Sequence, residues 1–289
     1  MSQRRRVTFV GCVKNSAEAL PAVLANIDSL SKSFSDHAYI FVENDSNDNT
    51  ASILKQWGEG KQDFNVHSLT GLDQLVGQRT VRLEICRNLY LAALQKIQYV
   101  STNDVVVMLD MDNVNITPIN TAGFESALNY LLQSKDVAAV TALQEGAYYD
   151  LWALRHPKYF NRDLWEDVLD AAIAEQLPDQ QAFDKIFATC DTSFISRENP
   201  TDVDSAFGGL GIYKMDALIR NPLKYSGQHT KFLLGGAPNF FRMQRCEHVS
   251  LNLGFKLLGM RVVIHPHLVN FGYGPITRLN PSAFRTLTF

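Results

Sequence analysis

Two aspartates spaced one residue apart are the residues best suited to chemistry in this sequence. Asp110 and Asp112 follow the apolar run 105–109. Such a run, rich in β-branched residues, predicts a strand buried on both faces, with the carboxylates at the point where the strand leaves the sheet. Ligands of open α/β sheets bind at that carboxyl edge. Two carboxylates there suit a hard cation, Mn²⁺ or Mg²⁺, that also contacts phosphate oxygens, so we predict a metal-assisted site for a phosphorylated donor.

Repeated strand, loop and helix patterns surround this site. Their order predicts a parallel sheet built from right-handed crossovers, and hence an α/β fold with a central, mostly parallel sheet flanked by helices. We expect a single domain over residues 1–289, with a nucleotide-binding half to about 145 and an acceptor-binding half from about 146. The predicted strands are 7–13, 39–43, 65–69, 105–110, 137–143 and 261–265, and the predicted helices are 16–33, 50–57, 80–98, 121–134, 164–175 and 247–258.

Some local features of this pattern are specific enough to test. Asn15 or Ser16 is expected to cap the first helix, and Asn49 or Thr50 the second. Beyond Gly146 the pattern loosens, and the glycine-rich stretch 206–211 is predicted to be a loop.

Composition excludes several classes of protein. The 289 residues are 46% hydrophobic and 20% charged, with a formal net charge of -3, so there is no electrostatic case for a nucleic-acid partner. The basic cluster Arg4-Arg5-Arg6 is expected to be a solvated chain end. A chain of this length buries about 75% of the surface that its unfolded form exposes, which is enough for a substantial core.

The sequence also predicts a compartment. It has no apolar stretch near the roughly 20 residues needed to span a bilayer, and 7–13 is too short for the apolar part of a signal peptide. We therefore expect a soluble, cytoplasmic protein with no transmembrane segment. The four cysteines lack metal-binding spacing and are expected to be reduced thiols. They are Cys12, Cys86, Cys190 and Cys246.

A second polar cluster follows the strand predicted at 39–43. Glu43 ends that strand, and its carboxylate is predicted to accept hydrogen bonds from a nucleotide base or ribose. Asp45 lies in the polar turn that follows and is assigned to the same donor-binding group. An ordinary strand-to-helix turn explains residues 45–50 equally well.

Arginines on the helix predicted at 80–98 supply positive charge for a diphosphate. Because the planar guanidinium group suits phosphate oxygens, we expect Arg82 and Arg87 to lie near the donor. Arg79, Arg82 and Asn88 cannot all face one way, so a solvated helix face is the alternative for part of this set.

The order of these motifs resembles that of a GT-A glycosyltransferase: Asn15, the 43–46 turn, Arg87-Asn88 and then Asp110-Met111-Asp112. The stretches 149–155, 207–213 and 246–248, followed by Gly259 and Pro266, are more specifically similar to the fungal capsule-associated α-1,3-mannosyltransferase family, glycosyltransferase family 69. The similarity runs over about residues 7 to 273. It departs from the family at Gly208-Gly209, which replace a Trp-Asn-Gly type of stretch, and in the lack of a membrane anchor.

This resemblance implies a nucleotide-sugar donor, typically GDP-mannose, a Mn²⁺ or Mg²⁺ ion, and transfer with retention to a sugar hydroxyl. It implies that Asp110 contacts the ribose or the donor sugar and that Asp112 binds the metal. It also implies that Asp150 and Arg155 line the sugar pocket and that Glu247 lies beside the reacting centre.

Residues in the second half are expected to serve catalysis and the acceptor. Glu247 opens a predicted helix, where it is a candidate base or a stabiliser of an oxocarbenium-like centre. An ordinary N-terminal glutamate favoured by the helix dipole is the alternative. We take Glu247 and Asp150 as the catalytic candidates. The acceptor-binding candidates are Trp152, Gly208, Gly209 and His248.

A histidine completes the predicted metal shell. His267 follows the last apolar strand, and Mn²⁺ accepts imidazole nitrogen alongside carboxylate oxygen, so we predict Asp110, Asp112 and His267 as ligands. A surface or core role for His265 and His267 is the alternative.

The predicted activity is metal-dependent transfer of a hexose, with mannose favoured, to a hydroxyl of a glycan or glycolipid. One alternative is a phosphatase of the haloacid dehalogenase type that uses Asp110 as nucleophile and Asp112 as acid or base. The sequence has no convincing downstream Gly-Asp-x-x-x-Asp stretch, and that nucleophile usually lies near the start of the chain. The other alternative is a sugar-binding module without turnover.

Overall fold

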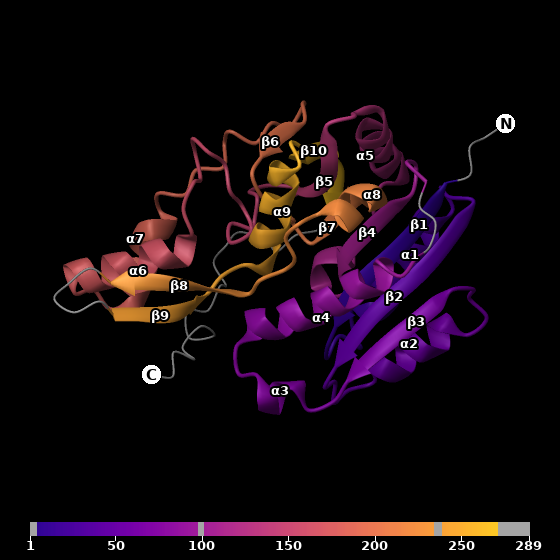
Figure 1. The fold of residues 1–289 in the computed structure, drawn as a ribbon, viewed down its shortest axis with the longest axis horizontal. Coiled ribbons are helices and arrows are strands. Elements are labelled where there is room, and N and C mark those ends of the chain that lie inside the picture. Colours follow the sequence, from indigo (N-terminus) through magenta and orange to yellow (C-terminus); the bar gives the residue numbers. More distant parts are fainter. Residues whose placement is uncertain (1–4, 98–100, 234–238, 271–289) are drawn as a thin grey trace.

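A computed structural model of the chain describes residues 5–97, 101–233 and 239–270. An eight-stranded sheet runs through the described part in the order β3-β2-β1-β4-β7-β5-β10-β6 (Figure 1). Its strands are β1 Arg6–Val13, β2 Asp36–Asn44, β3 Phe64–Leu69, β4 Val105–Asp110, β5 Val137–Gln144, β6 Thr201–Val203, β7 Leu210–Lys214 and β10 Arg261–Asn270. Predictions for Arg4, for the helix end at 98 and for the similarity over 271–273 lie outside the described residues.

Helices connect and flank these strands. They are α1 Leu20–Ser31, α2 Thr50–Gly58, α3 Leu72–Leu75, α4 Arg79–Leu94, α5 Thr121–Gln133, α6 Leu164–Glu175, α7 Asp179–Phe187, α8 Met215–Arg220 and α9 Glu247–Leu257, with a 3₁₀ turn, η1, at Asn113–Asn115. A separate hairpin consists of β8 Gln228–Leu233 and β9 Asn239–Gln244. Within the described residues, no helix is both long enough and apolar enough to cross a bilayer.

The strand pairing confirms a mostly parallel sheet. β3, β2, β1 and β4 are parallel neighbours, and so are β5 and β10. β7 runs antiparallel between β4 and β5, and β6 is an antiparallel edge strand. Because β7 comes from the second half of the chain, the two predicted halves share one sheet.

The prediction of a loop over 206–211 is wrong at its end. Leu210 and Gly211 begin β7, in which every residue is buried. At Gly211 a side chain would meet the ring of Tyr213, with a Cβ only 2.6 Å from it. The strand is short and contains a glycine that gives room to its neighbour, so it lacks the long apolar run by which β4 is recognised.

Two apolar layers cover the two faces of the sheet. Val106 and Met108 of β4 pack with the α4 and α9 side, whereas Val105, Val107 and Leu109 pack with α1 and α5. The alternation confirms that β4 is buried on both faces and that its carboxyl end is the exit from the core.

One predicted helix cap is confirmed in position and the other is wrong. Asn49 is the N-cap residue of α2, although its side chain makes no capping hydrogen bond. α1 begins at Leu20, and its N-cap residue Ala19 makes no side-chain hydrogen bond. Ser16 instead donates its backbone N–H to the Thr50 hydroxyl over 2.7 Å, while Asp48 accepts the backbone N–H of Thr50 at the start of α2. The polar residues therefore hold two adjacent loops together, a long-range use that cap patterns do not reveal.

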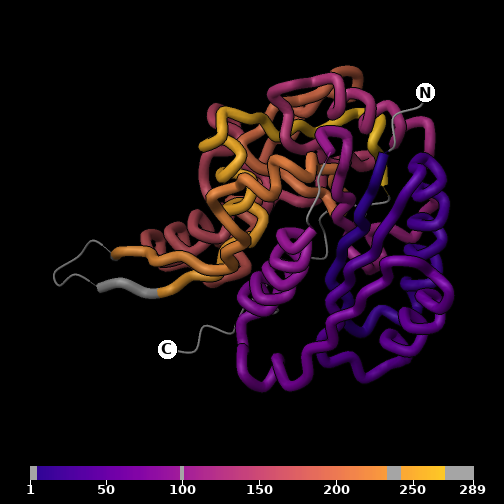
Figure 2. The backbone as a smooth tube through the Cα atoms, turned by 45° about the vertical axis from the view of Figure 1, so that its right-hand side comes forward, coloured from indigo at the N-terminus to yellow at the C-terminus, as the bar shows by residue number. Residues whose placement is uncertain are grey.

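α6, α7 and the β8-β9 hairpin lie together at one side of the sheet and are here called the arm (Figures 1 and 2). The arm has its own small apolar cluster, formed by Val168, Ala182 and Phe183 with Trp165 packed against it. The chain returns from β9 directly into α9. Only Arg245 and Cys246 separate the arm from the first residue of α9.

Candidate active site

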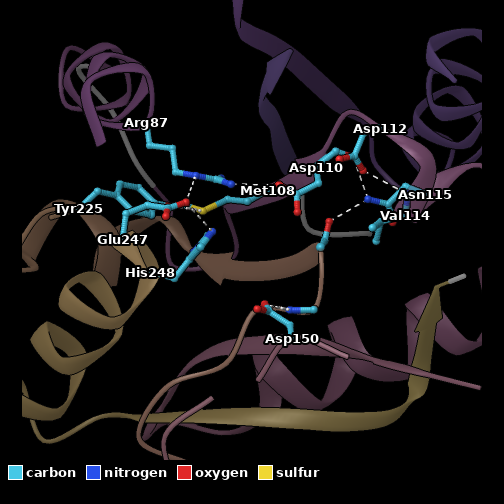
Figure 3. Close-up of polar contacts among 12 residues, drawn as sticks. Arg87, Met108, Asp110, Asp112, Val114, Asn115, Asp150, Tyr225, Glu247 and His248 are labelled. Carbon is cyan, nitrogen blue, oxygen red and sulfur yellow. Dashed lines mark hydrogen bonds and ion pairs between the residues drawn. The ribbon is translucent and has the colours of Figure 1, made fainter. Parts of the chain in front are cut away.

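One arginine side chain connects the carboxyl end of β4 to the start of α9 (Figure 3). Arg87 of α4 donates from Nη2 to Oδ1 of Asp110 and from Nε to Oε1 of Glu247, each over 2.9 Å. Arg87 and Glu247 are buried, whereas 29% of the Asp110 side chain is exposed. The structure thus links a carboxylate that solvent can reach to one that it cannot.

Aromatic rings fix the position of this guanidinium group. Its Cζ atom lies 5.3 Å from the centre of the Phe207 ring and 5.6 Å from that of Tyr225. The Tyr90 hydroxyl accepts a hydrogen bond from Nη1 at 3.4 Å and lies 2.8 Å from the Tyr225 hydroxyl. Cation–π contacts and hydrogen bonds from three elements leave Arg87 little freedom to leave the site.

His248 lies beside the same ion pair. Its ring stacks on Phe207 at 3.8 Å between ring centres, and its Nε2 is 3.8 Å from Oε1 of Glu247. Burial and the nearby Arg87 charge hold the pKa of His248 well below its usual value, so the ring is neutral near pH 7. Neither ring nitrogen has a hydrogen-bond partner within the described part of the chain.

Asp150 is the carboxylate with the most altered titration at the site. Burial raises its pKa to about 6, and the carboxylates of Asp110 and Glu247 act in the same direction. Hydrogen bonds from the backbone N–H groups of Gly208, at 2.9 Å, and Ala153, at 3.3 Å, oppose the rise. A carboxylate with this pKa changes its charge close to physiological pH.

The two glycines predicted to contact an acceptor are buried and have positive φ angles, 66° at Gly208 and 81° at Gly209. A Cβ at Gly208 would lie 2.7 Å from the Ala142 carbonyl oxygen, and one at Gly209 would lie 2.3 Å from Val114. Other parts of this chain therefore occupy the space that a side chain at either glycine would need. The Gly209 carbonyl also accepts the backbone N–H of Asp110 at 2.9 Å, so this turn positions the end of β4.

The charges of three carboxylates act on the Tyr149 hydroxyl. Burial raises the pKa of this hydroxyl well above the usual value, and the charges of Asp150, Asp110 and Asp112 raise it further. Asp112 is half-buried, and its Oδ1 accepts the backbone N–H of Val114 at the start of η1. Three of the predicted site carboxylates therefore lie near enough to Tyr149 to raise its pKa.

The predicted metal ligands are only partly together. Asp110 and Asp112 share one strand end, but the described residues contain no group of three or more His, Cys, Asp or Glu side chains arranged to hold a metal ion. His267 is exposed, and its backbone N–H donates to Nδ1 of His265. Mn²⁺ and Mg²⁺ commonly bind one or two carboxylates and complete their shell with substrate phosphates and water, so the two aspartates fit such an ion without His267.

The predicted donor-binding residues of the first half hold a loop. Glu43 is buried and accepts the backbone N–H of Ser46 at 2.8 Å, and Asp45 accepts those of Gly71 and Asp73. The Arg82 Nε atom lies 3.1 Å from Asp73, and its Nη1 donates to the carbonyls of residues 76 and 77. These contacts hold Arg82 against α3 and the residues that follow it, and its place near the donor stays a prediction.

Arg155 and Trp152 lie where the arm meets the sheet. Arg155 is buried, forms an ion pair with Asp163 and donates to the carbonyls of Trp152 and Leu154. The Trp152 ring meets Trp165 of α6 edge-on, with ring centres 6.2 Å apart. Both residues therefore position the arm, whatever else they contact.

Three buried amides under the site escaped the sequence analysis. The Asn115 side chain donates to the carbonyls of Asp110 and Gly209, each at 2.8 Å. Asn270 donates to Asn115 and to the Gly208 carbonyl, and Gln144 donates to Asn270. The only local signal is that Gln144 and Asn270 each end an apolar strand, as Asp110 does.

Comparison with solved structures identifies the fold. Mannosyltransferase PcManGT from Pyrobaculum calidifontis, solved in complex with GDP-Man and Mn²⁺, matches 96% of this chain and 59% of its own, with 16% identity and a TM-score of 0.52. This chain thus spans about three fifths of the length of that protein. The match shows an α/β fold with a central, mostly parallel sheet flanked by helices, as in GT-A transferase structures.

Two further structures are similar at TM-scores below 0.5. Glucosyl-3-phosphoglycerate synthase from Mycobacterium tuberculosis, in complex with UDP, has a TM-score of 0.37 and 15% identity over 74% of this chain and 58% of its own. Mannosyl-3-phosphoglycerate synthase from Rubrobacter xylanophilus has a TM-score of 0.36 and 14% identity over 73% and 54%. No protein-family model matches the chain, and no curated protein is similar to it in sequence.

Proposed function

We propose that this chain is a metal-dependent glycosyltransferase that moves a hexose from a nucleotide-diphosphate sugar to a hydroxyl of a glycan or glycolipid. The observation that carries the proposal is the linkage Asp110–Arg87–Glu247, which fixes the strand end that would hold the donor relative to a buried carboxylate. The GT-A fold supports it, since ligands of such sheets bind at this edge.

Mannose and GDP are the favoured donor components. The motif order of the sequence resembles glycosyltransferase family 69, and PcManGT was solved with GDP-Man. Asp112 and Asp110 are the proposed ligands of Mn²⁺ or Mg²⁺. When bound, the cation supplies Lewis-acid stabilisation of the charge on the departing diphosphate.

The side chains of this site have distinct proposed tasks. Arg87 holds the Asp110 carboxylate in one orientation and keeps Glu247 beside the reacting centre. Asp150 receives the proton of the acceptor hydroxyl, a task suited to a group with a pKa of about 6. His248, neutral and with no partner for its ring nitrogens in the described chain, is placed to hydrogen-bond a sugar hydroxyl. A carboxylate base favours inversion, whereas the family resemblance favours retention, so the stereochemical outcome tests the role of Asp150.

The test is product analysis on a panel of GDP- and UDP-sugars with Mn²⁺, with and without a chelator. We expect metal-dependent release of nucleoside diphosphate from one donor. Release of inorganic phosphate instead would indicate the phosphatase alternative, and donor binding without release would indicate a sugar-binding module. NMR of the transferred sugar then distinguishes inversion from retention.

A further inference from the structure

A pocket at the base of the arm has no role in the function proposed above. It has a volume of about 460 Å³ and lies between the start of α6 and the hairpin that leads into α9. Charged side chains dominate its wall, and only Arg155 among them was a predicted site residue. The lining residues are Arg155, Asn161, Arg162, Asp163, Glu166, Asp167, Asp170, His229 and Arg245.

Every carboxylate of this wall already has a basic side chain as its partner, with Lys231 shared between Glu166 and Asp170. Asp163 pairs with Arg155, Asp167 with Arg162 at 3.1 Å, Asp170 with Lys231 at 2.7 Å, and Glu166 with His229 and with Lys231 at 3.5 Å. When Arg245 is included, four carboxylates face the four permanent cations Arg155, Arg162, Lys231 and Arg245, so the pocket has no net negative charge to repel an anion.

Arg245 differs from the other cations. Its backbone N–H donates to the Gly227 carbonyl at 3.0 Å, but its guanidinium group has no hydrogen bond or ion pair to any residue that the structure describes. The side chain is half-buried. Burial, together with the nearby charge of Arg155, lowers the pKa of Arg245, and the charges of Asp163 and Glu166 oppose this only in part. An anion in the pocket would remove this penalty.

We propose that this pocket binds a carboxylate or phosphate group of the acceptor substrate, with the Arg245 guanidinium as its main ligand. A guanidinium group has donors in a planar fork that matches the two oxygens of either anion. The assignment to the acceptor rests on the proposed transferase function and on chain geometry. Only Cys246 separates Arg245 from Glu247, so the Cα atom of this pocket residue lies at most about 7 Å from that of a proposed catalytic residue.

The experiment is calorimetric binding to the full chain, with mannose 6-phosphate and glucuronic acid as anionic probes and mannose and glucose as neutral ones. Mannose 6-phosphate and glucuronic acid differ in their anion, so their relative affinities distinguish a phosphate site from a carboxylate site. We expect at least one anionic probe to bind and Arg245→Gln to weaken that binding by about 10- to 100-fold, the range for a charge-assisted hydrogen-bonded pair.

Arg242→Gln is the matched control, because Arg242 is an exposed arginine on the same strand, β9. It should change the affinity less than twofold. Arg245→Lys keeps the charge but loses the fork, and should weaken binding less than Arg245→Gln. It also provides a second variant if Arg245→Gln does not fold.

Three results would overturn the proposal: no anionic probe bound at about 10 mM, equal affinity for the neutral sugars, or equal weakening by Arg242→Gln and Arg245→Gln. Donor cleavage by the wild-type chain without acceptor tests the transferase function separately. Failure of the pocket and failure of the transferase function are therefore distinguishable.

Discussion

Arg82 and Arg87 lie about one and a half turns apart on α4, yet they belong to two different kinds of structure. The partners of Arg82 are Asp73 of α3 and the carbonyls of residues 76 and 77, which lie between α3 and α4. The partners of Arg87 are 23 and 160 residues away in the sequence. One arginine closes a local loop, and the other joins distant elements at the candidate active site.

The difference shows what decides the role of a charged residue on a helix. Arg82 remains partly exposed, so solvent screens its charge and its ion pair contributes little to stability. Arg87 is buried beside the buried Glu247, so removing Arg87 would leave an uncompensated carboxylate inside the protein. The following predictions test whether this contrast is real.

The largest expected effect is that of Arg87→Ala on stability. The variant leaves Glu247 buried without its cation, so we expect the free energy of unfolding to fall by about 3 to 5 kcal/mol. Urea denaturation followed by circular dichroism measures this change. A loss below about 1 kcal/mol would mean that Arg87 contributes no more to stability than an arginine in a surface ion pair.

Asp112→Ala is expected to affect turnover rather than folding. Loss of a metal ligand removes several kcal/mol of charge stabilisation, so release of nucleoside diphosphate should fall by about 100-fold or more. Asp216→Ala is the control, since Asp216 forms only an exposed i,i+4 ion pair with Arg220. Near-normal metal-dependent turnover in Asp112→Ala would contradict the assignment of the metal site to the end of β4.

A smaller effect is expected from pH. With a pKa of about 6, Asp150 is ionised above that pH and able to accept a proton, and is protonated below it. Thus kcat/KM should decline about tenfold per pH unit below pH 6. Asp150→Asn should lower the rate and abolish this limb of the profile. A wild-type profile that stays flat from pH 5 to about 7 would contradict the role of Asp150 as a base.

How much of the site follows from sequence can be judged from these same residues. The end of β4 was predictable because a buried strand has a local signature and its carboxyl edge is where ligands bind. The choice between Arg82 and Arg87 was not, because helical spacing shows that the two differ in direction but not what each one faces. That depends on Asp110 and Glu247, which only the folded chain brings to α4.

The same reasoning explains the missed parts of the fold. β7 has five residues, one of them glycine, and it joins the sheet because β4 and β5 both offer an open edge to it. Buried amides such as Asn115 are equally hidden, since a polar residue after a strand predicts a solvated turn unless its partners are known. Local patterns identify elements with strong periodicity, and tertiary contacts decide the rest.

The smallest effect in this series is expected from Arg82→Gln. Because Arg82 contacts only the loop before α4, we expect a loss of less than about 1 kcal/mol in the free energy of unfolding. The donor KM should change by less than about threefold, since no contact of Arg82 reaches Asp110 or Asp112. Asp73→Asn weakens the same ion pair from the other side, but it also weakens the ion pair of Asp73 with Lys14, so its effect on stability should be at least as large. An increase of tenfold or more in donor KM for Arg82→Gln alone would mean that this guanidinium group leaves its present partners to bind the donor. The two arginines would then differ only in how exposed they are.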